Sequence, residues 1–223
     1  EKWGLLGMLT VDTSVTLAGF TTPALYSGEP WKTHAVPVFD YFSDELKEKI
    51  QSKNPRTAVP RGGKIDFDVP GKLVGNWFAE GTDYAGAKEK GQYCGDYICP
   101  YWAGHVAFVY DFVDPSQVRV SIGYDAGLGD QGPYGVGKGG VDPAVVVVTN
   151  GVVKYELVKL KDVTAQKGFV SQGKALITEN TNEVLGTVVV EMISDRKIKF
   201  EVFAVKKASD VKGFSGKEKV YVR

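Results

Sequence analysis

Along residues 64–223, apolar and polar side chains alternate in short segments, the pattern of β-strands that bury one face. The clearest example places Val106, Phe108, Tyr110 and Phe112 on one face and polar or smaller residues on the other. Further strands are expected at Leu73–Phe78, Val118–Ile122, Ala144–Thr149, Val152–Leu160, Gly173–Ile177, Leu185–Ile193, Ile198–Ala204 and Lys219–Arg223.

Turn sequences separate these strands. Asn150-Gly151 is the strongest hairpin signal, and Asp114-Pro115-Ser116 and Ser194-Asp195-Arg196 are typical of tight turns. The polar stretch Thr178–Glu183 is interpreted as another link. Because consecutive strands tend to pair, the prediction is a mainly β fold, an antiparallel meander that forms a barrel or a sandwich, with the barrel favoured. The last strand is expected to pair beside the first.

Residues 1–63 differ and are predicted to form an N-terminal extension to a β-domain of residues 64–223. The extension contains one short helix, which Ser43 caps and which ends near Ile50, with Leu46 and Ile50 on a buried stripe. The apolar strand Trp3–Val11 is expected to pack on the β-domain or to pair with a second copy of the chain, which would allow self-association.

Composition and charge limit the classes of partner that this chain is expected to bind. The chain has 223 residues, and 27 Lys and Arg balance 27 Asp and Glu, so the basic face that binds nucleic acid is not expected. The longest apolar run, Ala144–Val148, is far too short for a transmembrane segment. The chain starts at Glu1 without a signal peptide, which indicates a mature, processed product, or else a truncated chain.

The two cysteines lie close together. Four residues separate Cys94 from Cys99, a spacing that can close a small disulfide loop. A zinc site usually needs four nitrogen or sulfur ligands, and the chain has two Cys and two His in total. A disulfide indicates an oxidising compartment, so the expected location is extracellular or on the cell surface. Two free thiols in a cytosolic protein are the alternative.

The cysteines belong to an aromatic-rich segment, residues 81–103. Aromatic side chains held on a loop suit contacts with carbohydrate or protein, and they can also cover the end of a barrel. The candidate ligand-binding residues here are Tyr84, Tyr93, Tyr97, Tyr101 and Trp102.

A Gly-x-Trp motif, Gly75-Asn76-Trp77, lies on the first strand of the expected barrel. In this, residues 72–223 resemble the calycins, the lipocalins and their relatives, although the insertion at 81–103 departs from their usual pattern. The resemblance implies an eight-stranded barrel in which Trp77 closes one end beneath an arginine, Arg223 or Arg196, and the open end binds a small apolar ligand. Trp77 is therefore a candidate ligand-binding residue too, and the alternative is that it belongs to the core alone.

The segments Gly4–Asp12 and Val38–Phe42 are similar to the last barrel strands of secreted zinc endopeptidases of the lysostaphin type. Catalysis in those enzymes needs a His-x-His pair and further ligands, and His34 is the single histidine in this part of the chain. The resemblance therefore implies no protease activity. It suggests that residues 1–50 are the remnant of a larger processed precursor.

The acidic residues suggest one possible cofactor, Ca²⁺. Asp125, Asp130 and Asp142 lie in a glycine-rich stretch and could supply oxygen ligands to Ca²⁺, although their spacing matches no known calcium loop. A second acidic set is Glu80, Asp83 and Asp96. The alternative is a flexible loop without metal, and no other cofactor is expected.

Catalytic groups are sparse. His105 and Asp111 lie on one extended segment about 20 Å apart, too far to form a dyad. The carboxylates of Asp66 and Asp68 are expected on a solvated face. The favoured function is an extracellular, non-enzymatic binding or structural module whose partner is a small ligand, a glycan or a protein. The alternatives are a calycin-like carrier of a small apolar ligand and a hydrolase with an unrecognised active site.

Overall fold

The computed structural model describes residues 10–17, 19, 30–80, 104–123, 128, 132–163 and 177–223, and the backbone of 93–94 and 97–98. The N-terminal elements are β1 (Thr10–Val11), α1 (Pro30–Thr33), β2 (Ala35–Val36), a 3-10 turn at Val38–Tyr41 and α2 (Asp44–Gln51). The remaining elements are β3 (Gly75–Ala79), β4 (Tyr93–Cys94), β5 (Tyr97–Ile98), β6 (His105–Tyr110), β7 (Val118–Ile122), β8 (Gly132–Val136), β9 (Val152–Asp162), β10 (Thr178–Ser194), β11 (Lys197–Ala204) and β12 (Lys219–Val222), with 3-10 turns at Val148–Asn150 and Ala208–Asp210.

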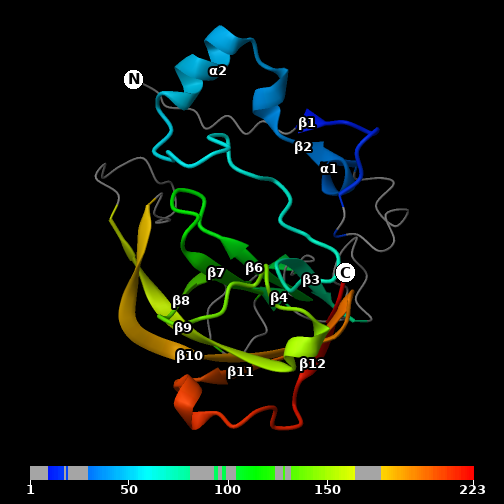
Figure 1. The fold of residues 1–223 in the computed structure, drawn as a ribbon, viewed down its shortest axis with the longest axis vertical. Coiled ribbons are helices and arrows are strands. Elements are labelled where there is room, and N and C mark those ends of the chain that lie inside the picture. The colour runs from blue at the N-terminus through cyan, green and yellow to red at the C-terminus, as the bar shows by residue number, and fades with distance from the viewer. Residues whose placement is uncertain are drawn as a thin grey trace.

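Eight strands form a closed antiparallel barrel in the order β10-β11-β12-β3-β6-β7-β8-β9. Figure 1 shows this ring of strands with α2 above it. The predicted mainly β meander is confirmed, and the structure decides for the barrel over the sandwich. The last strand closes the ring as predicted, because Tyr221 of β12 pairs with Ala79 and Val222 pairs with Phe78. β4 and β5 form a separate two-stranded pair.

The alternating pattern correctly placed the core at β6, β7 and β11. Val106, Phe108, Val120 and Ile198 are at most 1% exposed, and they point into the barrel. Phe112 was expected to continue this face, but it is exposed because β6 ends at Tyr110.

Three predicted elements are wrong. Asn150-Gly151 is not a hairpin turn between two strands, because residues 144–147 are not a strand and a 3-10 turn precedes Gly151. Val146 instead inserts into the core, and its carbonyl accepts a hydrogen bond from Leu73 N. The strand that pairs with β9 here is instead β8, which lies within a stretch that the sequence favours as a loop. Thr178–Glu183, predicted as a link, is the start of the 17-residue strand β10.

The N-terminal segment is fixed to the barrel by Arg56, which is 5% exposed. Its Nη1 donates to the carbonyl of Phe112 at 2.5 Å, and its Nε donates to that of Pro60 at 2.7 Å. The predicted Ser43 cap of α2 is confirmed by a 3.4 Å hydrogen bond from Leu46 N.

The buried stripe predicted for α2 is wrong, because Leu46 is 42% exposed and Ile50 is 39% exposed. Most of the predicted strand Trp3–Val11 lies outside the described residues, and its last two residues pair with β2 as β1. Among the described helices, none has the length and apolar character needed to cross a bilayer.

Candidate functional site

Aromatic rings occupy the interior of the barrel. The Phe108 ring on β6 contacts Tyr155 on β9 and Phe200 on β11, with centroids 5.4 and 6.3 Å away. Neither β9 nor β11 neighbours β6 in the sheet, so these contacts reach across the barrel. Side chains can fill an eight-stranded barrel in this way. The Tyr155 side chain is fully buried, and its hydroxyl finds no hydrogen-bond partner in the described structure.

One end of the interior is sealed by Trp77 and Arg223. The guanidinium carbon of Arg223 lies 4.0 Å from the centroid of the Trp77 ring, and Trp77 Nε1 donates to the carbonyl of Leu73 at 2.8 Å. Arg223 Nη1 also donates to Asp68 at 3.1 Å and to the carbonyl of Val74 at 2.7 Å. This is the arrangement that the calycin resemblance implies, and it selects Arg223 over Arg196.

A buried polar chain continues from this seal. Asp68, expected on a solvated face, has a side chain that is 4% exposed, and it accepts hydrogen bonds from N and Nδ2 of Asn76. Burial raises the pKa of Asp68 to about 6, against the lowering effect of the Asn76 hydrogen bonds. His105 Nε2 donates to Asn76 Oδ1 at 2.9 Å, and burial lowers the pKa of His105 to about 4. Every side chain in this series of polar contacts is hydrogen-bonded to the next, and the series holds β3, β6 and β12 together.

The outer wall of the barrel carries a different feature. β9 pairs with β8 only at Gly135–Val158 and Val136–Leu157. Beyond this point, residues 159–162 of β9 and 178–183 of β10 form an arm that pairs with itself. The register of β10 shifts between Asn180 and Val184, so residues 181–183 bulge out of the ladder. Figure 1 shows β10 as the long curved strand along the barrel wall.

Arg119 holds the arm against the barrel. It lies on the outer face of β7, is 3% exposed, and forms an ion pair with Asp111 at 3.0 Å. Its Nη1 donates to Oδ1 of Asn180 at 2.8 Å, and its Nη2 lies 3.3 Å from the carbonyl of Thr178. Nδ2 of Asn180 in turn donates to the carbonyl of Val136 at 2.8 Å. We call these contacts the Arg119 clamp.

Gly135 makes this clamp possible. A side chain at residue 135 would collide with the Oδ1 atom of Asn180, so the strand beneath the arm needs glycine there. The Arg119 clamp and the bulge together hold the start of β10 in a fixed position relative to the end of β8.

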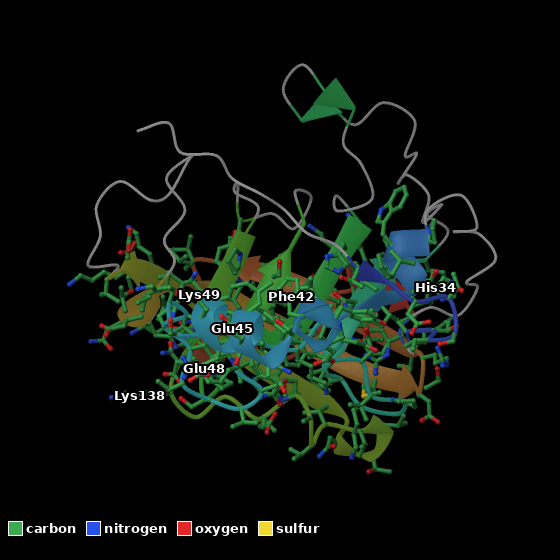
Figure 2. All side chains as sticks on the ribbon, turned by 90° about the horizontal axis from the view of Figure 1, so that it is seen from above. His34, Phe42, Glu45, Glu48, Lys49 and Lys138 are labelled. Carbon is green, nitrogen blue, oxygen red and sulfur yellow. The ribbon has the colours of Figure 1, made fainter. Side chains whose placement is uncertain are left out.

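Between the arm and the end of β8 lies a groove of about 570 Å³. Its wall combines amide, hydroxyl and charged side chains with three valines: Gln117, Val136, Gly137, Lys138, Glu156, Val158, Glu179, Asn180, Thr181, Asn182 and Val184. Within the described part of the chain, the side chains of Lys138, Glu179 and Asn182 make no hydrogen bond or ion pair. Figure 2 shows Lys138 projecting away from the body of the molecule.

Comparisons with protein-family models, curated proteins and solved structures find no match for this chain. The candidate site is therefore defined by its geometry alone.

The structure places only some of the candidates found from the sequence. Trp77 is buried beneath Arg223, and whether it also contacts a ligand stays a prediction. Asp142 accepts hydrogen bonds from the Tyr110 hydroxyl at 2.5 Å and from Ala144 N at 2.9 Å. It follows β8, whereas Asp125 and Asp130 precede β8 and lie outside the described residues, as does Asp83. No group of three or more potential metal ligands comes together among the described residues, and calcium binding stays a prediction.

The aromatic candidates Tyr84, Tyr101 and Trp102 lie outside the described residues, and so does Cys99. For Tyr93, Tyr97 and Cys94 only the backbone is described, in β4 and β5, where Cys94 pairs with Tyr97. Of the second acidic set, Asp83 and Asp96 lie outside the described residues, and Glu80 pairs with Lys197 at 2.6 Å. The disulfide therefore stays a prediction.

Sequence reasoning missed the groove. One signal was available, because Arg119 is a charged residue within the otherwise apolar and small strand Val118–Ile122. The other residues of the groove gave no sequence signal, since Glu179 and Asn182 belong to a polar stretch that is typical of a link.

Proposed function

We propose that this protein is a non-enzymatic binding module in which the barrel is the scaffold and the groove beside the arm is the binding site. The observation that carries the proposal is that Lys138, Glu179 and Asn182 share this groove and that their side chains make no hydrogen bond or ion pair within the described chain. The Arg119 clamp fixes the strand that presents two of them, and a site preorganised in this way loses little entropy when a ligand binds.

The packed interior supports a scaffold more than a carrier. A carrier of a small apolar ligand needs a cavity within its barrel, but Phe108 meets rings from opposite walls. The calycin-like character of the fold is supported by the closed barrel and by Trp77 beneath Arg223. The proposed ligand site therefore lies on the outer face of the barrel, in the groove beside the arm.

The buried charged side chains pair with one another, which supports binding more than catalysis. Arg119 pairs with Asp111 and Arg223 pairs with Asp68, and all four side chains are at most 13% exposed. His105 is engaged with Asn76 and packs against the Phe78 ring. In each case the neighbours of the buried polar side chain explain its presence.

The proposed location is extracellular or at the cell surface, and it depends on a disulfide between Cys94 and Cys99. Titration of the unfolded, unreduced protein with a thiol reagent is expected to find no free thiol. Two free thiols per chain would remove the argument for an oxidising compartment.

The binding function can be tested with a library of small polar and apolar fragments and two-dimensional ¹⁵N–¹H NMR of the full chain. We expect amide shifts centred on Gly137 and Asn182. Thr181→Trp, which fills the groove, should abolish them, and Lys49→Trp on the exposed face of α2 should not. If no fragment shifts the groove while an apolar dye such as 1-anilinonaphthalene-8-sulfonate binds and fluoresces, then the protein is a carrier and the proposal is wrong.

A further inference from the structure

We infer that the ligand of the groove is a neutral saccharide, an inference that depends on the proposed binding function. The charges that the groove leaves available cancel. Lys138 and Glu179 carry opposite charges and make no hydrogen bond or ion pair within the described chain, whereas the carboxylate of Glu156 already accepts from Ala208 N at 3.0 Å. An anion would meet the Glu179 carboxylate, and a cation would meet the Lys138 ammonium. A ligand without net charge meets no such penalty.

The groove offers hydrogen-bond donors and acceptors together. Asn182 provides a donor and an acceptor side by side, Glu179 provides acceptors and Lys138 provides donors. Each hydroxyl of a sugar both donates and accepts, so a row of neighbouring hydroxyls can satisfy all three side chains at once. A ligand with only donors or only acceptors would leave some of them unpaired.

The groove also has an apolar wall and a suitable size. Val184, which is half-buried, offers an apolar side chain among the polar groups, and the C–H face of a sugar ring can pack on it, whereas Val136 and Val158 are buried beneath the groove. The volume of about 570 Å³ is in the range of small-ligand sites.

The test is a titration of the full ¹⁵N-labelled chain with cellobiose, maltose and N,N′-diacetylchitobiose, and separately with glycylglycine and inorganic phosphate. At least one disaccharide is expected to shift the Gly137 and Asn182 signals. Asn182→Ala and Glu179→Ala should each weaken that binding by about tenfold, the loss of one good hydrogen bond. Glu48→Ala on α2 (Figure 2) is the matched control and should leave the binding unchanged.

The outcomes separate the two proposals. Shifts in the groove with glycylglycine or phosphate but with no disaccharide would overturn the saccharide inference and leave the binding function standing. Disaccharide binding that Asn182→Ala and Glu179→Ala do not weaken would also overturn the inference. If neither these probes nor the fragment library shifts the groove, both proposals are wrong.

Discussion

Replacing Arg119 by methionine is expected to destabilise the protein strongly. The change removes the ion pair with Asp111, whose side chain is 13% exposed, and the hydrogen bond to Asn180. The larger part of the cost comes from leaving the Asp111 carboxylate buried without its cation, which typically costs about 3–5 kcal/mol. A domain has roughly 5–15 kcal/mol of stability, so the variant should fold but with a much reduced margin.

Urea unfolding followed by circular dichroism measures this loss. With a slope of roughly 2–3 kcal/mol per molar urea, the midpoint should fall by about 1–2 M. Asp111→Asn removes the buried charge and keeps the oxygen that accepts from Val113 N and Asp114 N. In the Asp111→Asn background, Arg119→Met should therefore cost clearly less than it does alone.

The control is Lys159→Met. Lys159 pairs with Glu183 at 3.2 Å, but both side chains are more than half exposed, so the loss should stay below about 1 kcal/mol. If Arg119→Met costs no more than Lys159→Met, or if its cost is the same with and without Asp111→Asn, then the clamp does not hold the arm and the argument for a preorganised groove is refuted.

Three further outcomes are expected from urea unfolding. Trp77→Ala should cost roughly 3–5 kcal/mol because Trp77 is fully buried, and a cost under about 1 kcal/mol would contradict that placement. Tyr155→Phe should stabilise the protein by about 1 kcal/mol, because it removes a buried hydroxyl that has no partner in the described structure; a destabilisation would reveal a partner. His105 has a folded pKa of about 4, below its ordinary 6.5, so its contribution to stability is lost as pH falls from 6.5 to 4. His105→Gln should flatten that part of the stability curve by up to roughly 3 kcal/mol, and an unchanged curve would rule out a buried neutral histidine. Asp68, with its pKa raised to about 6, acts in the opposite sense in both proteins, so the difference between them isolates His105.

The sequence predicted the parts of the fold in which each strand has one buried face. β6, β7 and β11 alternate because every second side chain enters the barrel. It failed at β8, where Gly132, Pro133 and Gly135 are typical of a loop. The glycine at 135 is required by Asn180, which lies 45 residues later in the chain, and a pattern of neighbouring residues carries no information about such a contact.

The start of β10 was missed for a related reason. Thr178–Glu183 belongs to the arm and is polar, because this part of the strand is held by hydrogen bonds to β9 and to Arg119 rather than by burial of an apolar face. The prediction for Leu46 and Ile50 failed in the opposite direction, because it expected burial and both side chains are exposed. Their spacing correctly indicated a helix, but a spacing alone does not show whether another surface covers that face.

The pairing of β12 with β3 has a consequence for how the chain folds as it is synthesised. β3 is the first barrel strand to leave the ribosome and β12 the last, so one edge of β3 has no strand partner until almost the whole barrel sequence has been made. Until then Trp77 lacks the guanidinium that covers it, and both ends of the growing sheet are open edges of the kind that pair with other chains. Closure is thus a late event that depends on a contact between distant parts of the chain, and until it forms the open sheet is exposed to pairing with other chains.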